Sequence, residues 1–93
     1  MFHVMARIRV TDFNAWKQAY DRGRSVRDSM GIREFNLWRN VDDPLDVVLL
    51  LHATHVAKAK AYFESEELAQ RMAAAGVEQP PEVVYLGDSS SLG

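Results

Sequence analysis

The segment 47–53, VVLLLHA, constrains the fold of this chain more than any other part of the sequence. Its first five residues, 47–51, are the longest apolar run of the chain. The segment has the length of a strand, and the turn-forming segment 40–46 (NVDDPLD) precedes it. Its apolar residues fall on both alternating faces, so this strand must be covered on both sides. A chain of 93 residues has few elements that can supply those two layers.

The first third of the chain predicts a strand, a helix and a second strand. Residues 3–10 alternate between faces, which is the period of a strand. Asp12 offers an N-cap, and from Phe13 to Met30 large side chains recur at three- and four-residue steps, which predicts one amphipathic helix. Gly31 suits the position that ends a helix, and residues 32–39 then form a strand.

The last third of the chain predicts a second helix and a fourth strand. The helix begins at Thr54 or His55, and Ser65 with two following glutamates predicts a break inside it. Gly76 ends the helix, and residues 83–86 form the last strand. The order of elements predicts an α+β, ferredoxin-like βαββαβ fold, in which two helices cover one face of a four-stranded antiparallel sheet.

One face of the predicted sheet has no helix to cover it. Large side chains nevertheless fall on both parities of the second strand, with Phe35 and Leu37 on one and Ile32 and Trp38 on the other. An exposed apolar face of this size marks an interaction surface. We therefore expect residues 1–87 to form one domain that pairs as a homodimer through this face. Residues 88–93 read as a flexible C-terminal tail.

Composition excludes several classes of protein. The net charge of −2 gives no electrostatic footprint for nucleic acid or an anionic membrane, and the third strand lacks the aromatic residues with which RNA-recognition domains stack bases. The chain has no cysteine, so disulfides and thiolate chemistry are excluded. No signal peptide or membrane span is evident, which predicts a cytoplasmic protein.

Four stretches of the sequence together resemble a known superfamily. They are MFHVMARIRV, TDFNAWKQAY, FNLWRNVDDPLDVVLLLHA and AKAYFESEELAQRMAAAGVEQPPEVVYL. In order and length they resemble the dimeric α+β barrel superfamily of antibiotic-biosynthesis-monooxygenase-like and polyketide-cyclase-like domains, and its small uncharacterised members most. The resemblance implies a sheet-to-sheet dimer and a substrate pocket between the sheet and the helices of each protomer.

His52, Arg7 and Arg9 are the candidate catalytic residues. His52 interrupts an apolar strand, and an imidazole can act as a general acid or base near neutral pH. Arg7 or Arg9 could hold an enolate or phenolate oxygen, or could instead pair with acids such as Glu34. His52 and His55 form an H-x-x-H pair, which is too few ligands for zinc, so no metal site is expected.

Aromatic and polar residues on the helices and the second strand are the candidate substrate-binding groups. Tyrosine and tryptophan carry a polar atom that needs a partner when buried, so they can both line and orient a ligand. Trp16 can equally be a core residue, and His55 an exposed residue at a helix start. The candidate set is Trp16, Tyr20, Asn36, Trp38, His55 and Tyr62.

These features predict a cofactor-independent cyclase or monooxygenase-like enzyme that acts on a polyketide or aromatic polyphenol through an enolate. The haem-degrading branch of the superfamily uses an asparagine near the start of the first strand, which this sequence lacks, so no cofactor is expected. The alternative is a non-catalytic homodimer that binds a small molecule or is structural.

Overall fold

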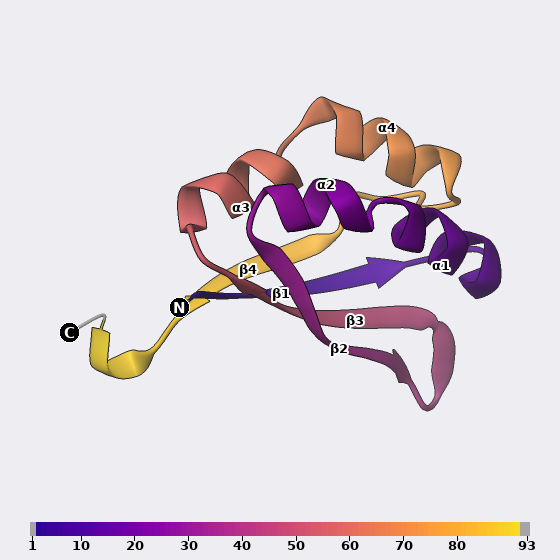
Figure 1. The fold of residues 1–93 in the computed structure, drawn as a ribbon. Coiled ribbons are helices and arrows are strands. Elements are labelled where there is room, and N and C mark those ends of the chain that lie inside the picture. The colour runs from indigo at the N-terminus through magenta and orange to yellow at the C-terminus, as the bar shows by residue number, and fades with distance from the viewer. Residues whose placement is uncertain (1, 92–93) are drawn as a thin grey trace.

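The computed structural model describes residues 2–91, in which four helices lie over the same face of one sheet (Figure 1). Its strands β1 (Phe2–Arg9), β2 (Ile32–Asn40), β3 (Asp43–Ala53) and β4 (Glu82–Gly87) pair antiparallel in the order β2-β3-β1-β4. The helices are α1 (Phe13–Arg22), α2 (Arg24–Ser29), α3 (Val56–Phe63) and α4 (Glu66–Ala74), and a 3-10 turn, η1 (Ser89–Ser91), follows β4. The predicted ferredoxin-like α+β fold is confirmed.

The core lies between the helices and the sheet. Buried and exposed residues alternate along β1, and each buried one pairs with a buried residue of β3. The pairs are Val4 with Leu51, Ala6 with Leu49 and Ile8 with Val47. Each buried Val, Leu or Ile contributes roughly 1.5–3 kcal/mol, so these two central strands form a rigid floor beneath the helices.

Polar side chains begin two of the helices as the sequence predicts. The Asp12 carboxylate accepts a hydrogen bond from the Ala15 backbone N–H at the start of α1. The Ser65 hydroxyl accepts one from the Leu68 N–H at the start of α4, so the predicted break at Ser65 is confirmed. Such caps contribute about 1 kcal/mol each.

The prediction of one helix over residues 13–30 is wrong at Gly23. The chain forms α1 up to Arg22 and a separate helix, α2, from Arg24. Glycine is a weak helix former because its backbone is freer than that of other residues, and here it is also buried. The break therefore coincides with a point where the backbone is closely packed.

A β-bulge in β2 changes which side chains share a face. The register with β3 shifts between Glu34 and Asn36, so one extra residue is inserted there. Phe35 stacks on His52 and Trp38 pairs with Val48, which places both on the face away from the helices. The prediction that Phe35 and Trp38 lie on opposite faces is therefore wrong.

Helix α4 is less buried than the other helices and the central strands. None of the nine residues of α4 is buried, although Leu68 and Met72 pack against the core.

Of the predicted tail, residues 89–91 form η1, while residues 92–93, like Met1, lie outside the described residues. Within residues 2–91 no helix is long and apolar enough to cross a membrane.

Candidate functional site

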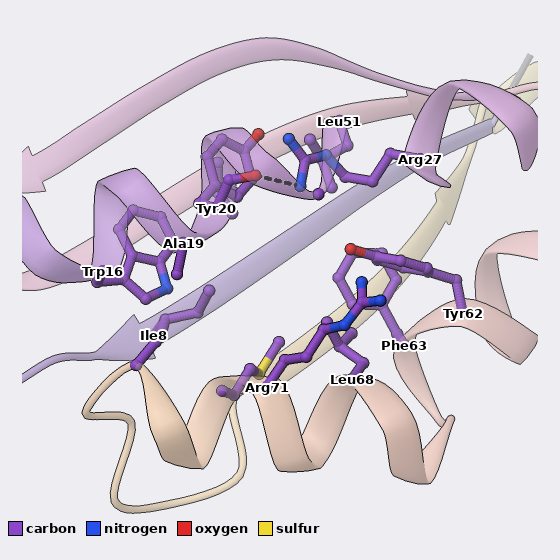
Figure 2. Close-up of a pocket in the computed structure, with 14 residues that line it drawn as sticks. Ile8, Trp16, Ala19, Tyr20, Arg27, Leu51, Tyr62, Phe63, Leu68 and Arg71 are labelled. Carbon is purple, nitrogen blue, oxygen red and sulfur yellow. Dashed lines mark hydrogen bonds between the residues drawn. The ribbon is translucent and has the colours of Figure 1, made fainter. Parts of the chain in front are cut away.

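A cavity of about 60 Å³ lies between the helix-facing side of the sheet and the helices (Figure 2). Its floor is apolar and comes from the two central strands, and its walls are mainly apolar and aromatic. This is the usual make-up of a small-molecule site, where a few polar groups orient the ligand. Its aromatic and polar lining includes Trp16, Tyr20, Arg27, Tyr62 and Arg71, with Gly23 beside them.

Arg27 is the buried cation of this cavity. It lies on the inner face of α2, and only 7% of its surface is exposed. Its Nη1 donates a hydrogen bond to the Tyr20 carbonyl oxygen at 2.7 Å, and its guanidinium carbon lies 3.8 Å from the centre of the Tyr20 ring (Figure 2). Among the described residues, no carboxylate lies within ion-pair distance of Arg27.

Tyr20 holds Arg27 in place and is itself held from two sides. Its ring stacks on Trp16 with the ring centres 5.1 Å apart, and its hydroxyl donates a hydrogen bond to Glu34 Oε1 at 2.8 Å. Burial raises the pKa of the Tyr20 hydroxyl, and the hydrogen bond to Glu34 raises it further. Tyr20 is therefore a neutral support for the guanidinium and not a base.

Gly23 leaves the room that Arg27 and Tyr62 occupy. A Cβ atom at Gly23 would lie 3.0 Å from Arg27 Nη1 and 3.9 Å from the Tyr62 hydroxyl, so both polar groups border the same small space. Among the described residues, none forms a hydrogen bond with the Tyr62 hydroxyl. Figure 2 shows this hydroxyl directed into the cavity. A guanidinium and a free hydroxyl thus face one site.

The charges around the cavity are unbalanced. Two arginines line it, and no Asp, Glu or His does so among the residues that the structure describes. Arg71, at the more exposed side, pairs with Glu67 on α4 at 2.7 Å. The polar groove on the outer side of Tyr20 and Arg27 mixes both signs; its charged residues are Lys17, Asp21, Arg24, Arg27, Asp28, Arg33 and Glu34. The cavity itself therefore favours an anion.

The structure divides the predicted site residues between two faces of the sheet. Trp16, Tyr20 and Tyr62 line the cavity. The others do not: His55 is exposed at the start of α3, and His52, Arg7, Arg9, Asn36 and Trp38 lie on the side of the sheet away from the helices. The expectation that Trp38 and Asn36 share a slot with Tyr20 and Tyr62 is therefore corrected. Their faces follow from strand register, which the mixed pattern of β2 and β3 leaves ambiguous.

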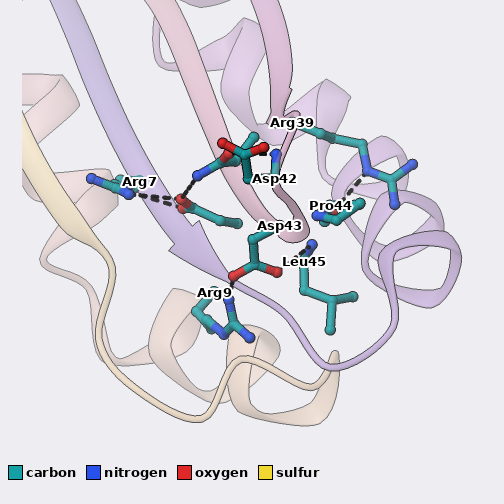
Figure 3. Close-up of polar contacts among 9 residues, drawn as sticks. Arg7, Arg9, Arg39, Asp42, Asp43, Pro44 and Leu45 are labelled. Atoms are coloured by element: carbon teal, nitrogen blue, oxygen red, sulfur yellow. Dashed lines mark hydrogen bonds and ion pairs between the residues drawn. The ribbon is translucent and has the colours of Figure 1, made fainter.

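Arg7 and Arg9 form ion pairs on this open face (Figure 3). Arg7 donates two hydrogen bonds to Asp46, from Nε at 3.0 Å and from Nη2 at 2.7 Å, and Arg9 pairs with Asp43. Asn40 donates a third hydrogen bond to Asp46. The Arg7 and Asn40 hydrogen bonds lower the pKa of Asp46 to about 2, and Asp46 raises that of Arg7. Both arginines thus have carboxylate partners, which Arg27 lacks.

His52 lies in a cluster of rings at one end of the open face. The His3 ring meets it edge-on and the Phe35 ring stacks on it, both with centres 4.7 Å away. His3 Nε2 lies 3.5 Å from Asp88 Oδ1. Among the described residues no group of three His, Cys, Asp or Glu side chains could hold a metal ion.

Sequence reasoning missed Arg27, Gly23 and Arg71. Arg27 falls on the inner stripe of the first predicted helix, where a charged residue breaks the apolar pattern. A lone arginine on an otherwise apolar stripe is the signal that could have indicated it, because charged residues are almost never fully buried unless they are paired.

Comparisons with known proteins agree with this architecture. No protein-family model matches the chain, and no curated protein matches it. The solved structures that do match include several named "putative antibiotic biosynthesis monooxygenase". The one from Bordetella bronchiseptica has a TM-score of 0.73 and 15% identity, over 94% of this chain and 95% of that one. The one from Nitrosomonas europaea has a TM-score of 0.65 and 19% identity, over 96% and 99%.

A third solved structure, named antibiotic biosynthesis monooxygenase, matches with a TM-score of 0.68 and 16% identity, over 95% of this chain and 98% of that chain. Identities this low relate folds and not activities. The resemblance predicted from the sequence is therefore confirmed at the level of the fold: nearly the whole chain has the fold of the antibiotic biosynthesis monooxygenase structures.

Proposed function

We propose that the chain is a cofactor-independent, monooxygenase- or cyclase-like enzyme that acts on a polyketide or aromatic polyphenol in the cavity between the sheet and the four helices. The observation that carries this proposal is Arg27, a residue with 7% exposure and no carboxylate partner among the described residues. Burying an unpaired charge costs several kcal/mol. A chain that keeps such a charge beside the free Tyr62 hydroxyl has a ready site for a negatively charged oxygen.

The proposed chemistry uses the positive charge of Arg27 to stabilise a negatively charged oxygen of the substrate. Loss of a proton beside a carbonyl gives an enolate, whose oxygen Arg27 and the Tyr62 hydroxyl would stabilise. In a monooxygenase-type reaction the enolate carbon of an anthrone-like phenol adds O₂ to form a hydroperoxide. Loss of water from the hydroperoxide leaves a carbonyl, so a CH₂ group and O₂ become C=O and H₂O. In a cyclase-type reaction the same enolate attacks a second carbonyl of the substrate.

The aromatic walls suit a flat substrate. The indole of Trp16 and the phenol ring of Tyr20 stack nearly parallel, with 17° between their planes, and Phe63 and Tyr62 stand on the opposite helix. Holding the reacting groups in one orientation lowers the entropic part of the barrier. The walls would therefore select planar substrates, while the polar pair would position the reacting oxygen.

The experiment is oxygen uptake and product analysis with an anthrone and with linear polyketide substrates. We expect wild type to turn over at least one of them, and both Arg27→Met and Tyr62→Phe to lower kcat by roughly 10²–10³. His52→Ala, on the other face of the sheet, is the matched control and should retain full activity. Absence of turnover on any such substrate, or full activity of Arg27→Met, would contradict the proposal.

We also propose that two copies pair through the open sheet face. Five of its apolar side chains are 37–57% exposed: Met5, Phe35, Trp38, Val84 and Leu86. They lie on β1, β2 and β4, and β3 adds the half-buried Val48 and Leu50. A contiguous apolar face of this kind is typical of an interface, and basic and acidic residues both lie around it.

The open face also supports the second candidate function, a non-catalytic homodimer that binds a small molecule or is structural. The same exposed side chains favour it, because pairing of the sheets needs no chemistry in the cavity. The oxygen-uptake experiment separates the two: a dimer that binds aromatic ligands without converting any of them is the outcome this second function predicts.

A further inference from the structure

The two arginines of the cavity differ in depth and in partner. Arg71 stands at the exposed side and has Glu67 as its counter-ion, so its charge is largely screened by solvent and by that carboxylate. Arg27 is buried, and the partners of its guanidinium within residues 2–91 are a backbone carbonyl and an aromatic ring face. These two contacts satisfy part of the guanidinium but do not neutralise its charge.

The cavity also lacks a group that could accept a proton. Among the described residues, those lining it include no Asp, Glu or His, and the two phenols are Tyr20 and Tyr62. Tyr20 is neutral, since burial and Glu34 raise its pKa. Glu34 itself lies behind Tyr20, bonded to its hydroxyl, and Glu67 lies outside, bonded to Arg71. An enolate site without a base needs another way to lose the substrate proton.

We propose that this cavity binds an acidic phenol or enol as its anion, with Arg27 as the counter-ion, and that no side chain of the protein acts as the base. The O–H bond breaks with its electron pair left on oxygen, and the proton passes to water on the side where Arg71 lies. This inference deepens the proposed function by naming the substrate class: flat compounds whose phenol or enol ionises near neutral pH.

The physical basis is the preference of a buried cation for a charged partner. An opposite charge within about 4–6 Å lowers the pKa of an acid by about 1–3, because it stabilises the ionised form. The apolar floor strengthens this effect, since few water molecules screen the pair. A neutral ether of the same shape gains no electrostatic stabilisation from Arg27, and an aromatic cation would be repelled by both arginines.

The test uses 4-nitrophenol, a small planar phenol whose anion is coloured, and 4-nitroanisole, its methyl ether, which cannot ionise. Absorbance is titrated against pH with and without excess protein. With wild type we expect the pKa of bound 4-nitrophenol to fall by about 1–3. We expect the phenolate to bind at least tenfold more tightly than 4-nitroanisole. Equal binding of the two compounds would overturn the proposal.

Two variants assign the effect to a residue. Arg27→Met keeps the apolar stem and should abolish both the pKa shift and the preference for the phenolate. Arg71→Met removes a cation from the same cavity on its exposed side and should leave most of the effect. If both variants lose the pKa shift equally, the positive charges around the cavity attract the phenolate without a special role for Arg27, and the proposal is overturned. Retention of the shift by Arg27→Met would do the same.

Two further measurements distinguish a loss of phenolate binding from a loss of folding. Circular dichroism and thermal unfolding check that Arg27→Met is folded; if it is not, Arg27→Lys, which keeps a cation, should retain a smaller shift, and its complete loss would count against the proposal. Phenolate binding without turnover of any polyketide would support this inference and contradict the proposed function. Turnover of a polyketide without a preference for the phenolate would support the proposed function and contradict this inference.

Discussion

The Arg27 guanidinium lies over the ring of Tyr20 and donates to the carbonyl oxygen of the same residue, at 3.8 Å and 2.7 Å. One residue thus supports the cation through both its side chain and its backbone. The support continues outward, because Tyr20 stacks on Trp16 and bonds to Glu34 in β2. The position of the charge therefore depends in part on Glu34, which does not line the cavity.

Two substitutions of Tyr20 should distinguish the contribution of its ring to stability from the contribution of its hydroxyl. Tyr20→Phe loses the hydrogen bond to Glu34 and should lower the free energy of unfolding by about 0.5–1.5 kcal/mol. Tyr20→Leu also removes the stacked ring and should cost roughly 1–3 kcal/mol more. Urea denaturation measures both. Equal losses in the two variants would show that the ring contributes nothing to stability.

Gly23→Ala should disturb binding more than stability. The backbone there has φ −84°, which alanine adopts readily, so we expect stability to change by no more than about 1 kcal/mol. The added Cβ would lie 3.0 Å from Arg27 Nη1 and should displace the guanidinium, weakening binding of 4-nitrophenolate. Thermal unfolding and absorbance titration measure the two effects. Unchanged binding would mean that Arg27 needs no space at this point.

Gly31→Ala is the contrasting variant. Gly31 has φ +72°, and a Cβ there would lie 2.2 Å from the Thr54 hydroxyl oxygen, so this substitution should destabilise the fold by more than 1 kcal/mol.

Lowering the pH should reduce the free energy of unfolding, because Asp46 becomes protonated. Its pKa is about 2 in the folded protein against an ordinary 3.8, so the unfolded chain binds this proton more tightly. The stability that this carboxylate contributes is then complete above about pH 4 and is lost as the pH falls towards 2. Urea midpoints between pH 2 and 5 should show this slope in wild type and a shallower one in Asp46→Asn and Arg7→Met. The same slope in all three proteins would exclude the pair as its source.

The proposed dimer should be sensitive to Trp38. Trp38 is 48% exposed near the end of β2, and a glutamate there would place a charge within the apolar face. We expect wild type to sediment as a dimer at micromolar concentration and Trp38→Glu as a monomer. Val41→Glu, in the turn after β2 where Val41 is 94% exposed, is the matched control and should remain dimeric. A monomeric wild type would overturn the pairing.

Local patterns predict the elements of this fold but not their faces. The caps at Asp12 and Ser65 and the order of strands follow from side-chain chemistry within a few residues of each other. The bulge before Asn36 is different, because one inserted residue moves every later side chain of the strand to the other face. Alternation along β2 cannot reveal such an insertion, so the faces of Phe35 and Trp38 required the structure.

The candidate site was predictable only in its aromatic part. Tyr20, Tyr62 and Trp16 stand out as amphipathic aromatics on helical stripes, and all three line the cavity. Arg27 interrupts an apolar helical stripe, but the sequence does not show that its side chain is buried. His52 has the parity of Val48 and Leu50 in a strand that is apolar on both faces. Charge and burial have to be known together before a functional cation can be distinguished from a solvated one.

The helix α4 contributes Leu68, Arg71 and Met72 to the cavity without burying any residue fully. The floor beneath it, by contrast, is built from the most deeply buried side chains of the sheet. Local opening requires least free energy where few groups are sequestered from water, so amide protons of α4 should exchange with solvent sooner than those of β1 and β3. Opening of α4 would widen the cavity on the side where Leu68, Arg71 and Met72 lie, while the side formed by the sheet would keep its shape.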